Sequence, residues 1–433
     1  MTLKMKLRSA VIILLVLVAI MLAVGSPILA QDDAVTLTYW RPENENGSSR
    51  ALYDDEDLLD KWATEHPNIE INLEQSPFES YDSKIITALA AGEAADILMI
   101  NHVALGSAIG TGGLHILDEC VASQALELDD WIQGLDLGVR NEGRYSVPWN
   151  TDARVLFYNK KILAEAGIDN PPATWDEFRD AFDAVAGLDS DVYPFAYAGA
   201  GSWAILYMWL GNWMVQMDTS LLNSNGDTSL VMTDETKMAF EFAVELAQYS
   251  PEASITYFPP DVHNSFAQGK IAFFIQGPWA NNTIQDNSDM VLGEDYDVAP
   301  IPGYTEAVRG GGALGGYHFA IAENSSHKDE ACEFIAWATS PEIMASANVF
   351  NIPARVSSIE SKIFQDRLTE NPIQRLAAAE ASKGGIPIPP VPELPEIATI
   401  VGDVFNRAVV GDYSTDQALE EMDGRIQELL EMR

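Results

Sequence analysis

The sequence has little positive charge. Its 433 residues contain 25 Lys and Arg but 65 Asp and Glu, so the formal net charge is −40 at pH 7. A surface of this sign repels phosphate backbones and anionic lipids, which argues against nucleic acid as a partner and against adsorption to a membrane surface. We interpret the excess acid as a solvated surface that keeps the protein soluble.

Catalytic and metal-binding motifs are also missing. No HExxH, P-loop, GxSxG or CxxC pattern occurs in the sequence. Carboxylates are so numerous that an acid pair for glycoside hydrolysis could be chosen almost anywhere, so no single pair is informative. The histidines are scattered rather than set at metal-ligand spacing on one helix, at His66, His102, His115, His263, His318 and His327. We therefore expect no catalytic residue, no metal and no cofactor.

Cysteine is nearly absent, with Cys120 and Cys332 as the only two. An exported protein could join them in a disulfide, whereas two buried free thiols are the alternative. The sequence cannot show whether the two residues lie close together, so both states stay open. No cysteine lies near the N-terminal signal described next, so a lipid-anchored N-terminus is not expected.

Residues 1–30 have the layout of a secretory signal peptide. Lys4, Lys6 and Arg8 precede an apolar run over residues 10–24, and the small residue Ala30 stands at the expected cleavage point. The run is shorter than the roughly 20 residues that a membrane-spanning helix needs. Because Ile28 is not a small residue, an uncleaved N-terminal anchor is the alternative to cleavage.

The rest of the chain reads as an alternation of strands and helices. With 47% hydrophobic residues, it can form a substantial core and two or three domains. The opening pattern is strand, helix, strand, helix, strand, over residues 35–40, 50–65, 69–73, 81–91 and 97–100. It predicts an α/β domain with a largely parallel sheet. Residues 202–217 are predicted to form one aromatic-rich helix, in which Trp209 and Trp213 belong to the core.

Several segments have a characteristic order and spacing. Residues 60–71 and 88–96 pass from helix to strand, VPWNTD at 147–152 is followed by LFYNKK at 156–161, and the later segments are PATWDEF at 172–178, FAQGK at 266–270, GPWA at 277–280 and NIPAR at 351–355. From about residue 35 to residue 430, the chain thereby resembles the extracellular solute-binding proteins (family 1) of carbohydrate ABC importers. This group includes maltose-binding protein.

The resemblance implies an α/β, two-lobed periplasmic-binding-protein-like fold (type II), with discontinuous lobes joined by a hinge. Lobe one would comprise residues 31–150 and 313–352, and lobe two residues 153–311 and 353–433. The hinge would lie near residues 149–152, 311–316 and 352–356. In open α/β sheets, ligands bind beyond the carboxyl ends of the strands, which agrees with a ligand in the cleft between the lobes.

Trp279 is the strongest candidate for a ligand contact. It follows a predicted buried strand and the pair Gly277-Pro278, where a flat indole ring can stack on the C–H face of a sugar. The alternative is a core tryptophan at the start of a helix. Asn150 and Asp152, at the first crossing between the lobes, could bind sugar hydroxyls or could be polar groups that stabilise the hinge.

Other candidates follow predicted strands or lie at the later crossings, where placement in a loop favours function. Asn101 could bind a hydroxyl or cap the next helix. Arg355 could contact ligand or form an interlobe salt bridge. The glycines of residues 310–316 would let the backbone approach ligand or absorb hinge rotation. The remaining candidates, each also explicable as a turn or core residue, are Trp40, Arg41, Asn44, Glu45, His102, Tyr197, Trp203, Gly311 and Gly312.

We therefore expect an exported substrate-binding component of an ABC importer, which captures a small-molecule ligand and delivers it to the membrane permease. The alternatives are an exported carbohydrate-active enzyme and a ligand-presenting subunit of a membrane sensor. A monomer is expected, in the periplasm or outside the cell, associated with the membrane through the permease or an uncleaved anchor.

A mono- or oligosaccharide is the first choice of solute. The abundant acids could instead serve a polyamine, and an anionic solute could be bound by arginines at Arg41, Arg154, Arg309 and Arg355. The proline-rich crossing at residues 386–395 contains no tryptophan, so a maltodextrin is not supported.

Overall fold

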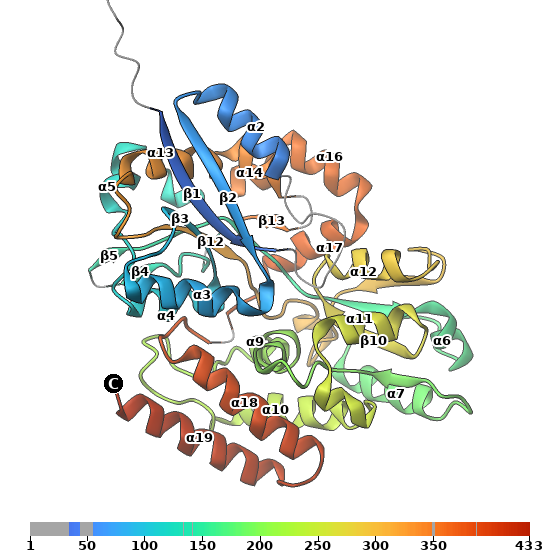
Figure 1. The fold of residues 1–433 in the computed structure, drawn as a ribbon. Coiled ribbons are helices and arrows are strands. Elements are labelled where there is room, and N and C mark those ends of the chain that lie inside the picture. The colour runs from blue at the N-terminus through green and yellow to red at the C-terminus, as the bar shows by residue number, and fades with distance from the viewer. Residues whose placement is uncertain (1–33, 44–54, 133, 141, 349–350, 387) are drawn as a thin grey trace, which may run out of the picture.

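Two β-sheets organise the chain (Figure 1). The computed structural model describes residues 34–43, 55–132, 134–140, 142–348, 351–386 and 388–433. The predicted signal peptide and the candidates Asn44 and Glu45 lie outside these residues. The first sheet has the strand order β2-β1-β3-β12-β6, and the second has the order β11-β8-β10-β9. Two sheets with their own helices confirm the expected two-lobed α/β architecture.

The first sheet opens as the sequence predicts. β1 (Val35–Pro42) pairs in parallel with β2 (Ile69–Ser76) and with β3 (Ile97–Asn101). Alternate residues of β3 face two separate core clusters, so helices cover both faces of the sheet. β12 (Tyr317–Ile321) then inserts antiparallel to β3 and to β6 (Val147–Pro148). The prediction of a largely parallel sheet is therefore confirmed, since β6 runs in the same direction as β1 to β3 and β12, where the chain returns, runs opposite to them.

The second sheet is also mixed. β8 (Val155–Asn159) lies antiparallel between β10 (Ile271–Gln276) and β11 (Tyr296–Ala299), and β9 (Tyr193–Phe195) is parallel to β10. All six residues of β10 are buried. This continuous apolar run is what a strand covered on both faces requires.

The helices follow the strands in chain order. Those of the first half and its return are α2 (Asp55–Glu65), α3 (Phe78–Ala91), α4 (His102–Gly110), α5 (Asp118–Ser123), η2 (Leu128–Asp130), α13 (Lys328–Ala338) and α14 (Pro341–Ala347). Those around the second sheet are α6 (Lys160–Glu165), α7 (Trp175–Ala186), α8 (Ser202–Ala204), η3 (Ile205–Leu210), α9 (Gly211–Gln216), α10 (Asp234–Ala247), η4 (Glu252–Thr256), α11 (Pro259–Ala267), α12 (Ala280–Asn287) and η5 (Glu306–Val308).

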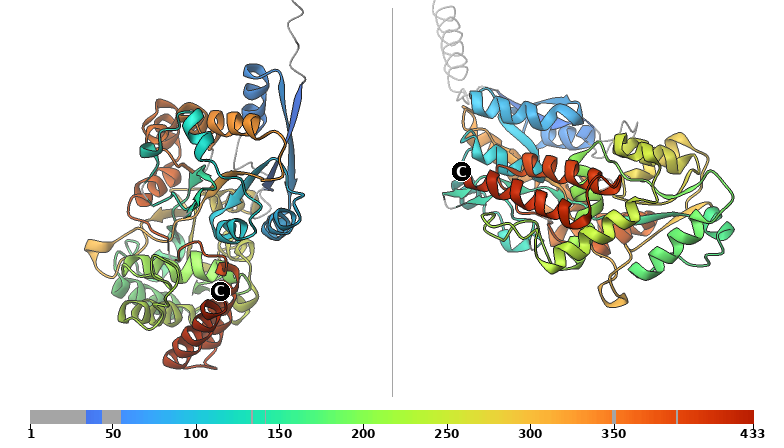
Figure 2. Two further views of the ribbon diagram at one scale, coloured as in Figure 1. Left: turned by 90° about the vertical axis from the view of Figure 1, so that its left-hand side faces the viewer. Right: turned by 90° about the horizontal axis from the view of Figure 1, so that it is seen from below.

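The C-terminal part is helical. Its elements are α15 (Val356–Glu360), α16 (Lys362–Glu370), α17 (Pro372–Ala381), α18 (Leu394–Val409) and α19 (Thr415–Glu431). α18 and α19 lie side by side on the second half of the molecule (Figure 1, Figure 2). α19 begins with a capping box, in which Ser414 and Gln417 each accept a backbone N–H of the other.

The segments that cross between the sheets lie side by side. β7 (Asn150–Thr151) pairs antiparallel with β13 (Ile352–Pro353), and Asp152 forms a β-bridge with Gly315. The next residue, Gly316, has a φ of +135°, and a Cβ there would overlap the carbonyl oxygen of Asn150. Glycine is therefore required where the two crossings come closest. A minor hairpin of β4 (Val139–Arg140) and β5 (Gly143–Arg144) precedes the first crossing.

The predicted helix over residues 202–217 forms, but not as a uniform α-helix. Its central part, η3, is a π-helix between α8 and α9. Trp209 and Trp213 are 2% and 0% exposed, which confirms them as core residues. A π-turn inside a helix shifts the side chains that follow it around the axis, and such turns are frequent at functional sites.

Cys120 in α5 and Cys332 in α13 form a disulfide, with their Cα atoms 5.7 Å apart. Of the two states that the sequence leaves open, the structure shows the bonded one. The cysteines are 212 residues apart in sequence, and the closed loop contains every strand of the second sheet. Along the residues described, no helix is both long and apolar enough to cross a membrane.

Replacement of both cysteines by serine should lower the free energy of unfolding by about 4 kcal/mol, because the disulfide would no longer restrict the unfolded chain. Thermal unfolding followed by circular dichroism measures the change. Reduction of the wild-type protein should lower the midpoint similarly. An unchanged midpoint in both experiments would contradict the bond.

Candidate ligand-binding site

Strand ends of the first sheet meet a helix of the second half in one buried contact. His102 directly follows β3 at the start of α4, and Tyr207 lies in η3. Their ring centroids are 4.7 Å apart and the rings are nearly perpendicular, at 79°. Both side chains are buried, at 4% and 1% exposure. This contact therefore joins the two halves of the molecule beyond the carboxyl end of β3, which is where open α/β sheets bind ligands.

Arg154 lies next to this contact, at the first crossing. It forms an ion pair with Asp152 and donates a hydrogen bond to the carbonyl oxygen of Ala313 at 3.2 Å. Its charge depresses the pKa of His102, which places the guanidinium near that ring. A Cβ on Gly315 would approach the Asp152 carboxylate to 2.8 Å, so glycine leaves the room that the ion pair occupies.

Trp279 forms a further wall of the site. It follows β10, and its ring folds back over Gly277, where a Cβ would overlap the indole. The guanidinium carbon of Arg154 lies 5.7 Å from the ring centroid. α12 begins directly after Trp279, so Asn282 and Thr283 follow it by about one turn and lie on its side of the helix.

The protonation states in this cluster follow from burial. Desolvation, aided by the charge of Arg154, lowers the pKa of His102 to about 3, so the ring is neutral at pH 7. Its Nδ1 lies 3.3 Å from the carbonyl oxygen of Gly316, which can only accept, so we assign the proton to Nδ1. Nε2 then presents a lone pair. Burial raises the pKa of Tyr207, which keeps its hydroxyl protonated.

Several polar atoms of this cluster are buried without a hydrogen-bond partner in the part of the chain that the structure describes. Buried polar groups in folded proteins are nearly always hydrogen-bonded, because an unmet donor or acceptor costs about 1–3 kcal/mol. Such atoms are therefore candidates for hydrogen bonds with a bound polar molecule. They are His102 Nε2, Arg154 Nε, Tyr207 Oη, Trp279 Nε1, Thr283 Oγ1 and both amide atoms of Asn282.

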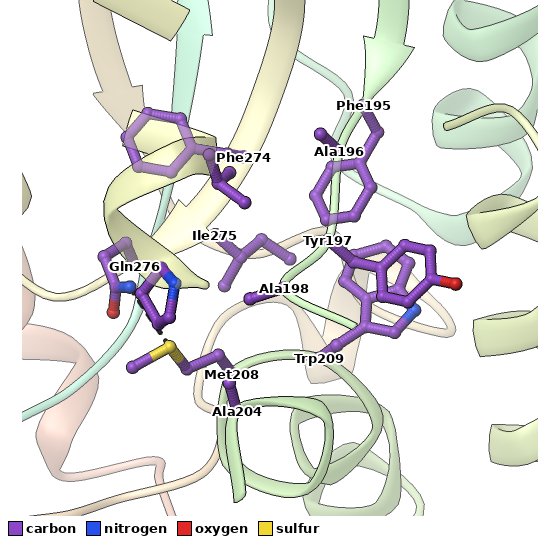
Figure 3. A pocket seen from close by; sticks show the side chains of 12 residues that line it. Phe195, Ala196, Tyr197, Ala198, Ala204, Met208, Trp209, Phe274, Ile275 and Gln276 are labelled. Carbon is purple, nitrogen blue, oxygen red and sulfur yellow. Dashed lines mark hydrogen bonds between the residues drawn. The ribbon is translucent and has the colours of Figure 1, made fainter. Parts of the chain in front are cut away.

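A small cavity of about 20 Å³ lies beside this cluster, at the ends of β9 and β10 (Figure 3). Tyr197, Met208 and Gln276 contribute to its lining, and the Gln276 amide donates to the Met208 sulfur at 3.1 Å. Its volume suits one or two water molecules and is far too small for a sugar. The cavity is therefore part of the packing behind the site, not the site itself.

The structure brings only some of the predicted residues into the cluster. Trp279, Asp152 and His102 belong to it. Trp203 in α8 lies one turn before Tyr207 and contacts Phe78 of the first half. Arg41, at the end of β1, is 3% exposed and donates to the carbonyl oxygen of Pro42 at 2.6 Å.

Other predicted residues have structural partners instead. Trp40 donates to the Glu74 carboxylate at 2.7 Å, and Asn101 caps α4 by accepting from the Val103 N–H at 3.0 Å. Tyr197 donates to Asn406 at 3.1 Å in α18. The hydrogen bond of Asn101 matches one of the two roles that the sequence left open for it, that of a helix cap.

The candidates at the crossings also have structural partners within the protein. Asn150 accepts from the Tyr317 N–H at 3.0 Å, and Gly311 donates to the Glu380 carboxylate at 2.7 Å. Gly312 has no room for a Cβ, which would meet Asn212 at 2.5 Å. Arg355 stacks over the Trp131 ring at 4.2 Å, with Asp130 3.6 Å from its Nε.

Sequence reasoning missed three members of the cluster. Tyr207 lies in an apolar, aromatic helix whose residues are all typical of a core, so nothing in the sequence distinguishes it from the core residues around it. Asn282 and Thr283 could have been found, because they follow the predicted contact Trp279 at helical spacing. Arg154 was considered only for an anionic solute. Among the residues described, no three His, Cys, Asp or Glu side chains are arranged to hold a metal ion.

Replacement of His102 by Asn should flatten the dependence of stability on pH. The folded-state pKa of about 3 lies below the ordinary value of 6.5, so the unfolded chain binds this proton more readily. Neutral His102 therefore contributes fully above pH 6.5, and its contribution declines as pH falls toward 3, by about 1.4 kcal/mol per pH unit. Unfolding free energies measured between pH 7.5 and 4 test this. Parallel curves for the wild type and the variant would refute it.

Comparisons with known proteins identify the family of this chain. The family model described as bacterial extracellular solute-binding protein matches residues 47–345. A binding protein of Brucella abortus is 28% identical over 284 residues, which cover 64% of this chain and 66% of that protein, just under two thirds of its length. The diacetylchitobiose binding protein DasA of Streptomyces coelicolor is 27% identical over 372 residues, 83% of each chain. The sugar-binding protein MalE of Xanthomonas citri has the same fold, with a TM-score of 0.77 at 24% identity over 92% of this chain and 98% of that one. The chain therefore belongs to the bacterial extracellular solute-binding protein family.

Proposed function

We propose that this protein is the exported substrate-binding component of an ABC importer. It captures a small solute, a mono- or oligosaccharide, where the strand ends of its two halves meet, and delivers it to the permease. The observation that carries the proposal is the group of buried, unpartnered polar atoms beside Trp279. The S. coelicolor relative is named for diacetylchitobiose, which supports a sugar as the solute.

The polar atoms of the cluster suit hydroxyl groups. His102 Nε2 can only accept, Arg154 Nε and Trp279 Nε1 can only donate, and the Tyr207 hydroxyl can do either. A hydroxyl both donates and accepts, so a polyhydroxylated molecule can satisfy all of them. An anion would be repelled by the His102 lone pair, and the charge of Arg154 is already balanced by Asp152.

Trp279 supplies the apolar part of the recognition. Sugar rings carry a C–H face as well as hydroxyls, and an indole ring can stack on that face. Because Gly277 has no Cβ, the indole ring of Trp279 can pack directly against the backbone at residue 277. A site with one aromatic surface and converging polar groups is typical of small-molecule recognition.

Closure of the lobes would take place at the crossings. We assign lobe one to residues 31–150 and 313–352, lobe two to residues 153–311 and 353–433, and the hinge to residues 149–152, 311–316 and 352–356. The paired crossings, with Gly315 and Gly316 at their closest approach, support this assignment. Hinge closure around a ligand is the established motion of periplasmic binding proteins.

The remaining parts of the proposal concern partners and location. The protein acts as a monomer in the periplasm or outside the cell, and it meets the membrane through the permease or an uncleaved anchor. It binds no nucleic acid and catalyses no reaction. The strongly acidic composition supports the exclusion of nucleic acid.

Trp279→Ala tests the proposed site. Residues 31–433 are screened by thermal shift against sugars, sugar phosphates, amino acids and polyamines. A sugar at 100 times its dissociation constant should stabilise the wild type by about 2.7 kcal/mol, and the variant should show no shift. Trp337→Ala, at a half-buried tryptophan in α13, is the matched control and should retain the shift. A shift only with a charged non-sugar solute would overturn the sugar assignment, and cleavage of sugar polymers would establish the enzyme instead.

A further inference from the structure

Asp82 belongs to α3, a helix of the first half that lies next to the second half (Figure 1). One turn earlier in the same helix, Phe78 contacts the ring of Trp203 in α8, with centroids 5.9 Å apart in an edge-on arrangement. Residues four apart on a helix have Cβ atoms about 5–6 Å from each other. Asp82 therefore lies beside an aromatic contact that joins the two halves.

Asp82 also lies near the strand ends. The Tyr81 hydroxyl donates to the carbonyl oxygen of Trp40 at 2.8 Å, close to the end of β1. After burial, the charge of Asp82 is the largest cause that raises the pKa of Tyr81, so the carboxylate is close to that hydroxyl. The carboxyl end of β1 is the same sheet edge at which His102 follows β3.

The Asp82 carboxylate has no partner among the residues placed in the structure. It forms no hydrogen bond or ion pair with any residue that the structure describes, and desolvation is the single cause that raises its pKa to about 7. The side chain nevertheless retains intermediate exposure to solvent. The surrounding protein therefore desolvates this carboxyl group, while the residue keeps some contact with solvent.

The nearest cations are engaged elsewhere. Lys84 Nζ lies 3.0 Å from the Ser76 hydroxyl and 3.7 Å from the centroid of the Trp40 ring. Arg41 donates to the carbonyl oxygen of Pro42. Neither lowers the pKa of Asp82. No cation among the described residues therefore balances the charge of this carboxylate.

We propose that Asp82, with the rings of Phe78 and Trp203, forms a subsite for a protonated amine, so that the solute is an aminated sugar or polyol. A buried carboxylate without a donor is stabilised most by a cation that also donates hydrogen bonds. Aromatic rings beside it favour an ammonium further. The inference rests on the proposed function and names the class of sugar that the site takes.

The two parts of such a solute would have adjacent places. Trp203 and Tyr207 are four residues apart on the same helical segment, α8 followed by η3. The amine subsite is thereby about one helical turn from the hydroxyl-binding cluster of His102, Tyr207 and Arg154, a separation of roughly 5–6 Å. One sugar ring can span that distance, so a single residue of an amino sugar can contact both.

Matched sugars test the amine subsite. Glucose and glucosamine, and diacetylchitobiose and its deacetylated form, are titrated calorimetrically into residues 31–433 at pH 7. In the wild type the amine member of at least one pair should bind about tenfold tighter, as expected for one added charge-assisted hydrogen bond. In Asp82→Asn the preference should fall below about twofold. Asp189→Asn, at an exposed acid of the second half, should keep it.

The outcomes separate the two proposals. Equal or tighter binding of the neutral members to the wild type would overturn the amine subsite but leave the sugar-binding function. Persistence of the amine preference in folded Asp82→Asn would overturn the role of Asp82. Failure of every sugar to bind the wild type would overturn both proposals. Should Asp82→Asn not fold, the preference of the wild type alone decides.

Discussion

Asp152 and Arg154 form a buried ion pair at the point where the chain first passes from one sheet to the other. Burial raises the pKa of Asp152 and the charge of Arg154 opposes that shift, so each charge depends on the other. The backbone fixes the pair, because Asp152 forms a bridge with Gly315 and Arg154 donates to Ala313. The same guanidinium lies near the rings of His102, Tyr207 and Trp279. The crossings and the walls of the site are therefore one unit, and loss of either charge would disturb both.

Local patterns in the sequence predict much of the fold. The order of β1, β2 and β3 and the capping of α19 follow from alternation of apolar residues and from short-range hydrogen bonds. The position of β12 does not, because a strand that returns from 170 residues beyond its neighbour β6 carries no local sign of its direction. The disulfide was undecidable for the same reason. Proximity across a long loop is a property of the whole fold.

The site was predicted where a residue's role depends on its neighbours in sequence. Trp279 follows a strand and needs Gly277 next to it, and both features are local. Tyr207 joins the cluster only when the two halves come together, since its ring meets His102 from a distant part of the chain. Asn101 shows the opposite limit. Its position after a strand suits a ligand contact and a helix cap equally, and only the observed hydrogen bond to Val103 distinguishes them.

The disulfide has a consequence for the order in which the molecule can be completed. If the chain is exported N-terminus first, as the proposed signal peptide implies, Cys120 reaches the outside before Cys332. Between them come all strands of the second sheet and also β12, which occupies the position between β3 and β6. The first sheet can therefore receive β12, and the disulfide can form, only after the strands of the second sheet have been translocated. The lobe that begins the sequence is thus the one whose assembly finishes later, and an oxidant that acts during export meets Cys120 while its partner is still inside the cell.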